Sequence, residues 1–501
     1  MTRKTKLMLN SASSLLYQLI TIICGFILPR FFLMYYGSEV NGLVSSITQF
    51  LGFISLAECG VGAVVQSTLY KPLAENNMLE VSKIILSSER FFKKIAYILL
   101  GYTAILMIVY PFITLKSFDY LFTLILIFVI SISIFAQYYV GMTYKLLLNA
   151  DQLGFIQYTI YAVALVLNTV LCIILMINGA SVHIVKLTTS LIFVMQPILL
   201  SAIAKRRYKI FRDIHLTEEP IKQKWNGLAQ HIAGVVLINA DVVVLTLFST
   251  LENVSVYAVY HLVVNGLRQI IVSFTNGMQA MLGNILAKGE TEELNQSFDR
   301  IEWFLHTVVT FVFSVTAVLI LPFVSVYTAK VRDANYIVPT FAYLITAAQA
   351  SYSLRLPYNI VILAAGHFKE TQWSAVTEAG MNVVLSIVLV SRFGLVGVAI
   401  GTLAAMTYRT CYFVWYLSKN ILYRKISFFL KHIFADAVSA AAIILFTKLF
   451  PDFFALQSKS FAGWGVLAVK TGILGLLIVA VTNLLFYRKK LVNYLKKFSR
   501  T

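Results

Sequence analysis

Arg268 lies near the middle of a long apolar segment that runs from about Asn253 to about Leu286. A cation at the centre of a lipid-facing helix costs at least ~2.5–3.5 kcal/mol, so this side chain is expected to face a helix-bundle interior or a watery cavity. A guanidinium also offers bidentate hydrogen bonds to phosphate oxygens and keeps its charge at any accessible pH. Its position therefore predicts a binding site for an anion, with Arg268 as the central residue.

Other polar residues fall on the same helical face as Arg268, or on one face of a later apolar segment. Residues three or four positions apart share a face because the α-helical period is 3.6 residues. Pro357 lies inside the later segment and is expected to weaken its backbone hydrogen bonds. Two such stripes could form one polar wall of a cavity. The substrate-binding candidates on the first stripe are His261, Asn265 and Arg268, and those on the second are Tyr352, Arg355 and Asn359.

Two further arginines, Arg30 and Arg409, lie within apolar segments but nearer their ends. They are additional cationic candidates for the same site, although snorkelling to the membrane surface would also accommodate them. The alternative for all of these embedded arginines is internal pairing with an embedded carboxylate. Three carboxylates could act either as structural counter-ions or in ion coupling: Asp241, Glu58 and Glu378.

The apolar segments that must position these residues dominate the composition of the chain. Of the 501 residues, 59% are hydrophobic and 13% are charged, and the mean hydropathy is +0.80. These values lie far outside the range of soluble globular proteins, so we predict an all-α polytopic membrane protein. Apolar runs of about 20 residues give about fourteen transmembrane helices. Their approximate centres are Ile20, Phe53, Leu106, Phe128, Ala164, Phe193, Val236, Ile270, Phe311, Gln349, Val384, Met406, Ala442 and Leu474.

The net charge of +19 is distributed in a way that indicates membrane orientation rather than nucleic-acid binding. Lysine and arginine gather at every second junction between the predicted spans, and such junctions are cytoplasmic by the positive-inside rule. We therefore predict a multi-pass protein of the cell membrane with both termini in the cytoplasm. The alternate junctions, the first near Gly37, are short. The basic clusters lie near Lys4, Lys94, Arg206, Lys425 and Lys489.

Shifting the chain against itself by about 213 to 215 residues brings similar residues into register. Leu73 meets Leu286, and Asn168 meets Asn382. A unit of six spans returns the chain to the same side of the membrane, so the two copies are predicted to be parallel repeats. The predicted parts are an N-terminal lobe with spans one to six (1–204), a cytoplasmic linker (205–224), a C-terminal lobe with spans seven to twelve (225–420), and spans thirteen and fourteen with a basic cytoplasmic tail (421–501).

Signatures of soluble enzymes are absent from the sequence. It contains no glycine-rich phosphate loop, no His-Glu-x-x-His and no Gly-x-Ser-x-Gly pattern, so we predict no catalytic residue, no cofactor and no metal. The four cysteines fall inside the spans, without metal-ligand spacing or a disulfide pattern. Gly397 and Gly401, four residues apart, are expected to allow close helix packing. Five scattered histidines are expected in loops or at the membrane interface: His183, His215, His306, His367 and His432.

Four short stretches near the N-terminus carry a family resemblance: Leu28–Phe31, Tyr36–Leu43, Leu56–Gly62 and Leu69–Leu73. They resemble bacterial polysaccharide-biosynthesis flippases of the Wzx type, which belong to the multidrug/oligosaccharidyl-lipid/polysaccharide exporter superfamily. The resemblance is concentrated in the first two spans. Fourteen spans arranged as two six-helix lobes plus two also match the wider group.

This resemblance implies a two-lobed transporter that works by alternating access. Its substrate would be an undecaprenyl-pyrophosphate-linked oligosaccharide, moved from the inner to the outer leaflet for capsule, exopolysaccharide or O-antigen synthesis. Related lipid II flippases have a cationic central cavity, to which Arg30 and Arg268 correspond in approximate position. The implied partners are the lipid-linked oligosaccharide, the lipid bilayer and the polysaccharide polymerase machinery. Coupling to Na⁺ or H⁺ is left open, and nucleic acid is not expected.

Two other functions remain alternatives for this sequence. A drug or cation antiporter of the same superfamily is expected to place carboxylates in its cavity, whereas the most central charge here is Arg268. A membrane-embedded polymerase or ligase of the same pathway usually needs a sizeable external loop, and the predicted outer junctions are short. A scaffold subunit without transport is disfavoured by the embedded arginines.

Overall fold

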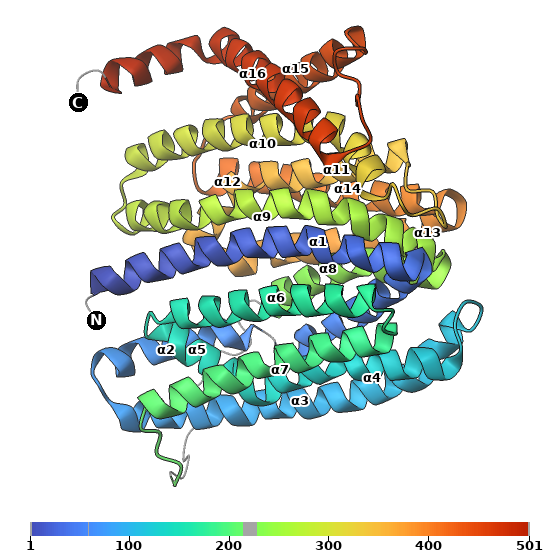
Figure 1. Ribbon diagram of the computed structural model, residues 1–501. Helices are drawn as coiled ribbons and strands as arrows, with labels where there is room; N and C mark the ends of the chain where they lie inside the picture. Colours follow the sequence, from blue (N-terminus) through green and yellow to red (C-terminus); the bar gives the residue numbers. More distant parts are fainter. Residues whose placement is uncertain (1–2, 59, 214–227, 499–501) are drawn as a thin grey trace. The chain divides into compact units, whose positions relative to one another are not determined.

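The computed structural model describes residues 3–58, 60–213 and 228–498, and all regular structure in these ranges is helical (Figure 1). Ten of the described helical segments are long and apolar enough to cross a membrane. A helix of 24 residues, such as α6 (Gly154–Ile177), is about 36 Å long and exceeds the ~30 Å hydrocarbon core of a bilayer. The chain is therefore an all-helical membrane protein, as its composition predicts.

The chain divides into two compact units, Met1–Val243 and Val244–Thr501. Helix α8 (Leu228–Phe248) contributes residues to both. The elements of the first unit, before α8, are α1 (Arg3–Gly52), the 3₁₀ helix η1 (Phe53–Glu58), α2 (Val61–Ala74), α3 (Met78–Thr114), α4 (Tyr120–Ala136), the π-helical turn η2 (Gln137–Gly141), α5 (Met142–Ala150), α6 and α7 (Val182–Arg207).

Helix α1 consists of two helical stretches separated at Gly37. This glycine has φ 81° and ψ 178°, a backbone conformation that is accessible to glycine and strained for other residues. The break coincides with the first predicted outer junction. The predicted span centred on Phe53 is therefore built from the end of α1, then η1 and α2, and Phe53 itself lies in the 3₁₀ segment.

At one end of the first unit, the start of α1 is tied to the end of α7. Lys6 Nζ lies 2.9 Å from Asp151 Oδ1, and the Tyr208 hydroxyl donates to Asp151 Oδ2 at 2.5 Å. Burial, together with the neighbouring Asp151 carboxylate, raises the pKa of Tyr208 above its ordinary value. The phenol therefore stays protonated and acts as the hydrogen-bond donor.

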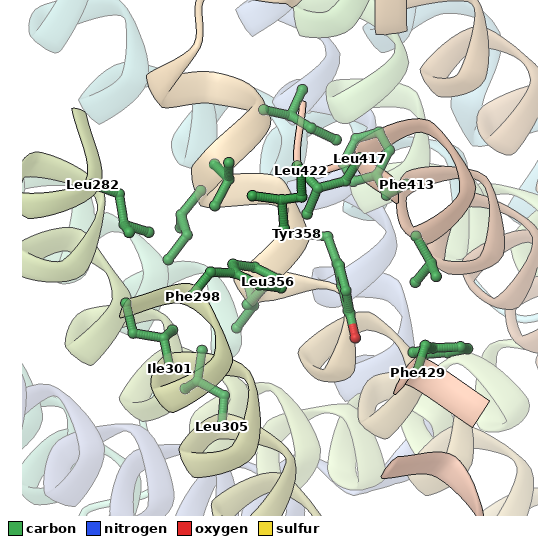
Figure 2. Close-up of a cluster of buried hydrophobic side chains, with 14 of the residues drawn as sticks. Leu282, Phe298, Ile301, Leu305, Leu356, Tyr358, Phe413, Leu417, Leu422 and Phe429 are labelled. Atoms are coloured by element: carbon green, nitrogen blue, oxygen red, sulfur yellow. The ribbon is translucent and has the colours of Figure 1, made fainter. Parts of the chain in front are cut away.

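After α8, the second unit is built from eight helices in the described part of the chain. They are α9 (Leu251–Ala287), α10 (Thr291–Tyr327), α11 (Pro339–Leu354), α12 (Leu356–Ala364), α13 (Phe368–Phe393), α14 (Leu395–Asn420), α15 (Ser427–Leu449) and α16 (Phe461–Phe498). Figure 2 shows a buried apolar cluster of this unit, to which α9, α10, α12, α14 and α15 contribute. Apart from Phe53, every predicted span centre lies in an α-helix.

The difference between ten spanning segments and fourteen predicted spans has a simple origin. One segment, Met8–Glu58, contains the centres of the first two predicted spans. Three more centres lie in α9, α11 and α14, which are not among the ten. Helix α11 has only 16 residues, and polar residues lower the mean hydropathy of α9 and α14.

The helix bounds repeat with the offset found in the sequence. Helices α3 and α10 begin at Met78 and Thr291, and α7 and α14 begin at Val182 and Leu395, an offset of 213 in both cases. Residues with positive φ recur at nearly the same offset: Asn76 with Gly289, Gln152 with Gly366, and Gly179 with Gly394. The turns between helices are therefore duplicated along with the helices.

Each unit also repeats the same internal packing. Helix α3 contacts α2 and α4 in the first unit, as α10 contacts α9 and α11 in the second. Likewise, α7 contacts α4 and α6, as α14 contacts α11 and α13. The second unit adds α15 and α16, both of which pack on α10.

Two glycines allow α13 and α14 to approach closely. A Cβ atom at Gly397 would lie 2.4 Å from the Leu389 carbonyl oxygen, and one at Gly401 would lie 2.6 Å from Ser386 Oγ. Asn382 on α13 donates to Thr402 Oγ1 on α14 at 3.1 Å, which a wider separation would break. The expectation that this glycine pair serves helix packing is confirmed.

We predict that Gly401→Ala lowers the stability of the second unit by about 1–3 kcal/mol, because the added methyl group overlaps Ser386. Gly380→Ala on α13 is the matched control, since no atom lies within 4 Å of its added Cβ and alanine favours helix by up to about 1 kcal/mol. Unfolding of the detergent-solubilised variants measures both. Equal stability of Gly401→Ala and Gly380→Ala would contradict the close packing of α13 and α14.

Candidate functional site

Helix α9 positions Arg268 and two of its predicted companions on one face. The Arg268 guanidinium donates from Nη2 to Asn265 Oδ1 at 2.6 Å, one helical turn earlier. One further turn along, the His261 ring stacks on Tyr257 with centroids 5.4 Å apart. His261, Asn265 and Arg268 are half-buried, whereas Tyr257 is buried at 5% exposure, so this face of α9 places polar side chains inside the unit.

Tyr352 brings the two predicted stripes together. Its ring centroid lies 4.8 Å from the Arg268 guanidinium carbon and 4.5 Å from that of Arg355. An aromatic ring attracts a cation placed over its face, and the attraction is stronger where water is excluded. One tyrosine on α11 therefore holds the arginine of α9 next to the arginine that follows α11.

Arg355 stands at a break in the helix, between α11 and α12. Pro357 occupies the first turn of α12, and the backbone changes there to a short turn in which Tyr358 N donates to the Arg355 carbonyl oxygen at 3.1 Å. The predicted weakening of the helix at Pro357 is thus a real interruption. Asn359 lies one turn after Arg355 in α12 and is half-buried.

Glu378 on α13 binds two arginines at once. Its Oε1 lies 2.6 Å from Arg355 Nη1, and its Oε2 lies 2.7 Å from Arg409 Nη1 on α14. The carboxylate is 1% exposed, and the Phe413 ring flanks both guanidinium groups at 5.8 and 4.9 Å. Arg355 and Arg409 are therefore held by internal pairing, the alternative that the sequence left open.

Arg268 differs from these two arginines. Within the described ranges, no carboxylate lies within ion-pair distance of its guanidinium, and its recorded polar contact is the neutral Asn265 amide. Arg268, Arg355 and Arg409 carry three positive charges against the single negative charge of Glu378. This group of four residues, called the arginine cluster below, has a net charge of +2.

The remaining predicted residues lie in the first unit. Arg30 is half-buried in α1, Glu58 accepts a hydrogen bond from the Tyr138 hydroxyl, and Asp241 in α8 is buried at 3% exposure. The structure thus divides the candidates between the two units. Asp241, Glu58 and Arg30 belong to one, and the arginine cluster with its neighbours belongs to the other.

Two lysines inside the helices of the first unit are not among the candidates that the sequence indicates. Lys186 lies in α7, with its Nζ 4.4 Å from the centroid of the Phe32 ring on α1. Lys145 is half-buried in α5, the short helix that follows the π-helical turn. Both lie close to predicted span ends, where lysine is ordinarily solvated, so their positions in the sequence indicate burial only weakly.

The expectation for the scattered histidines is wrong for two of them. His306 in α10 is 1% exposed and His432 in α15 is 2% exposed, and both sit among hydrogen-bonded partners. His183 and His367 are half-buried and bonded to a backbone carbonyl and a tyrosine hydroxyl. His215 lies outside the described residues.

The fold is similar to that of solved transporters, although the sequence matches no family model and no curated protein. The lipid II flippase MurJ in an inward closed conformation is 14% identical with a TM-score of 0.70, and the match covers 97% of this chain and 100% of that one. A multidrug resistance MATE family transporter of the MOP superfamily, inward-facing, is 13% identical with a TM-score of 0.59 over 80% of this chain and 93% of that one. An outward-facing structure of a multidrug resistance MATE family transporter is 14% identical with a TM-score of 0.53, and the match covers 82% of this chain and 93% of that one.

These similarities show that the chain has the fold of the MOP transporters. The match to the lipid II flippase covers more of this chain than the match to the inward-facing MATE structure. The part of the chain that the flippase leaves unmatched is shorter than either α15 or α16, so both helices take part in that match. The inward-facing MATE structure leaves unmatched a part longer than α15 and α16 together.

We predict that Glu378→Gln destabilises the second unit by about 3–5 kcal/mol, because it leaves two buried guanidinium groups without a counter-charge. The matched control is Glu370→Gln, an exposed residue in the first turn of the same helix, which should change stability by less than about 0.5 kcal/mol. Membrane abundance and unfolding in detergent report the difference. Wild-type stability of Glu378→Gln would show that the pairing with Arg355 and Arg409 is not structural.

Proposed function

We propose that this protein is a flippase that moves undecaprenyl-pyrophosphate-linked oligosaccharide from the inner to the outer leaflet of the cell membrane. The transport would proceed by alternating access and supply capsule, exopolysaccharide or O-antigen synthesis, as in flippases of the Wzx type. The observation that carries the proposal is the arginine cluster. It presents one arginine, Arg268, whose described neighbours are an amide and an aromatic ring rather than a carboxylate.

Charge complementarity supports a pyrophosphate as the ligand. The arginine cluster has a net charge of +2, and a pyrophosphate diester carries two negative charges. Arginine suits such a ligand because its planar fork forms two parallel hydrogen bonds with phosphate oxygens. Export of two negative charges from a cell that is negative inside gains roughly 4–5 kcal/mol per 100 mV, so the membrane potential could drive the step. The proposal leaves coupling to Na⁺ or H⁺ open.

The architecture supports a flippase over an antiporter. We propose fourteen spans in two parallel six-span repeats, with α15 and α16 as the added pair. The lipid II flippase matches over a length that takes in both added helices, and the inward-facing MATE structure matches over a shorter part of the chain. In addition, Glu378 is occupied by two arginines, which leaves its carboxylate unsuited to a cationic drug.

A polymerase or ligase has less support. The two longest connections on the predicted outer side, 328–338 and 450–460, are loops of about eleven residues between described helices. Neither is large enough for a catalytic domain. A role as a scaffold without transport would not require a guanidinium such as Arg268 in the middle of α9. Contact with the polymerase machinery is a further part of the proposal.

For the topology, we predict that cysteines introduced at Ala334 and Ser458 react from outside the cell, whereas a cysteine at Glu290 reacts only after the membrane is opened. The reason is the distribution of lysine and arginine, which assigns the α9–α10 turn to the cytoplasm. Impermeant maleimide labelling of a variant without native cysteines tests this. Labelling of intact cells at Glu290 together with protection at Ser458 would reverse the orientation.

For the anion site, we predict that Arg268→Ala reduces flipping about 10- to 100-fold at wild-type abundance. A hydrogen bond to a charged group contributes ~1.5–3 kcal/mol, and 1.4 kcal/mol corresponds to a factor of ten. Arg268→Lys should retain part of the activity, because it keeps the charge and loses the bidentate geometry. The measurement uses proteoliposomes that contain a fluorescent polyprenyl-pyrophosphate saccharide, whose leaflet is read with an impermeant quencher.

Arg392→Ala is the control for this experiment, since Arg392 is an exposed arginine in the last turn of α13. It should flip the lipid at the wild-type rate. Wild-type flipping by Arg268→Ala would remove this residue from the substrate site. Transport of a cationic drug in place of the lipid would favour the antiporter.

A further inference from the structure

A second polar cluster lies in the second unit and shares no residue with the arginine cluster. Its centre is Glu302 on α10, a carboxylate that is fully buried at 0% exposure. One of its oxygens, Oε1, accepts a hydrogen bond from the Tyr358 hydroxyl at 2.5 Å and contacts the Arg424 guanidinium. In Figure 2 the Tyr358 ring lies within the apolar cluster, and its hydroxyl oxygen is drawn in red.

The other oxygen of Glu302 is not satisfied in the same way. Oε2 is buried, has no hydrogen-bond partner among the described residues, and lies 3.5 Å from Nε2 of His432 on α15. Leaving a buried carboxylate oxygen unpaired costs several kcal/mol in an apolar surrounding. Asp299, one turn before Glu302 on α10, brings a second carboxylate, and the ligand atoms of these three residues lie within 4.8 Å of one another.

We propose that Asp299, Glu302 and His432 bind a divalent transition-metal ion, with Zn²⁺ as the preferred ion. Zinc binds imidazole nitrogen at ~2.0–2.1 Å and carboxylate oxygen at ~2.0–2.2 Å, and tetrahedral angles then separate two ligand atoms by roughly 3.3–3.5 Å. The 3.5 Å between Glu302 Oε2 and His432 Nε2 fits a pair of atoms that share an ion. Three protein ligands leave the fourth position for water.

The surrounding contacts orient the ligands as in known metal sites. His432 Nδ1 lies 2.7 Å from the Tyr487 hydroxyl, so its other ring nitrogen can present a lone pair toward Glu302. His306 continues the network, with Nδ1 2.6 Å from Asp436 Oδ2 and Nε2 3.2 Å from the Tyr358 hydroxyl. A metal-ligating histidine commonly bonds its second nitrogen to a carboxylate, a backbone carbonyl or water, and for His432 the Tyr487 hydroxyl oxygen would take that place.

The chemistry of the ligand set also favours a divalent transition-metal ion, because two carboxylates and an imidazole are ligands that Zn²⁺ takes. Arg424 contacts the oxygen of Glu302 that faces away from His432, so it does not occupy the ion's position. A small polar cavity lined by Asp436, Asn483 and His432, among others, adjoins the cluster and gives water a place beside it.

The imidazole nitrogen of His432 makes the proposed site selective for Zn²⁺ over alkali-metal ions. Na⁺ prefers oxygen ligands, whereas imidazole suits Zn²⁺ and its neighbours in the transition series. The alternative to a metal ion is a single proton between Glu302 and His432, which would form a direct hydrogen bond. The 3.5 Å separation, without hydrogen-bond geometry at Oε2, fits an ion between the two groups better than a direct hydrogen bond. In this position the ion would tie α15 to α10.

The test uses the full chain, purified in detergent with its affinity tag removed and stripped of metal with a chelator. Zn²⁺ is then titrated in competition with a metallochromic chelator. We expect one Zn²⁺ per chain and a higher unfolding temperature with Zn²⁺. His432→Gln should abolish the stoichiometric binding, Asp299→Asn should weaken it at least tenfold, and Tyr487→Phe should weaken it about 10- to 100-fold. Co²⁺ in place of Zn²⁺ should give the visible absorption of a four-coordinate ion.

His367→Gln is the control, since this histidine bonds to the Tyr416 hydroxyl and lies outside the cluster. It should bind Zn²⁺ as the wild type does. If His432→Gln fails to fold, Asp299→Asn and Tyr487→Phe decide the question, because they retain the imidazole and the buried Glu302. The proposal is overturned if the wild type binds no stoichiometric Zn²⁺, or if it binds Zn²⁺ no more tightly than folded Asp299→Asn and Tyr487→Phe. The site is independent of the flippase proposal, and binding can be measured without any transport.

Discussion

The cost of placing charge inside a membrane determines how the polar residues of this protein are arranged. Water is absent from the hydrocarbon layer, so an embedded charge needs a counter-charge, a hydrogen-bonding partner or a ligand. Glu378 meets this requirement with two arginines, and Glu302 meets it with Arg424 and Tyr358. Arg268 departs from the pattern because no carboxylate among the described residues lies within ion-pair distance of its guanidinium. A charge without a counter-charge is expensive in a structure and useful in a binding site, which is why the functional proposal rests on it.

The two units repeat the same helices, but the charged residues within these helices differ between the units. Position 355 of the second unit corresponds to Gly141 of the first, at an offset of 214, and both stand where a membrane helix is interrupted. In the first unit the interruption is filled by packing, since a Cβ atom at Gly141 would lie 2.5 Å from Pro197 Cβ on α7. In the second unit the corresponding place holds Arg355, paired with Glu378. At these two equivalent positions the first unit has a glycine in close packing, and the second unit has an arginine in an ion pair.

The sequence predicted the helical membrane class from its composition, and the offset of about 213 to 215 residues recurs in the helix bounds. The binding role of the polar face of Arg268 stays a prediction. The sequence could not predict that Arg355 and Arg409 share Glu378, since that depends on how α11, α13 and α14 pack. The sequence placed Phe53 at the centre of a helical span, whereas it lies in the 3₁₀ segment between α1 and α2. A hydropathy average over about 20 residues does not distinguish an α-helix from a short 3₁₀ segment within it. The burial of His306 and His432 could not be predicted, because their hydrogen-bond partners are far away in sequence, as in the contact between His306 and Asp436. The Zn²⁺ site that we propose could not be expected from the sequence for the same reason, since Glu302 and His432 are brought together only by the packing of α10 against α15.

The last two helices, α15 and α16, belong to the second unit and pack on α10. Lipid chains are as apolar as leucine, so apolar burial alone gives little preference for docking a hairpin on one face over another. Polar contacts and close packing supply that preference here. Trp303 Nε1 on α10 donates to Asn483 Oδ1 on α16 at 2.6 Å, and a Cβ atom at Gly475 would lie 2.7 Å from Val315 on α10. His432 on α15 adds a third fixed point beside Glu302. These contacts lie along α10 from Trp303 to Val315, so we expect α15 and α16 to move together with α10 when this unit changes conformation.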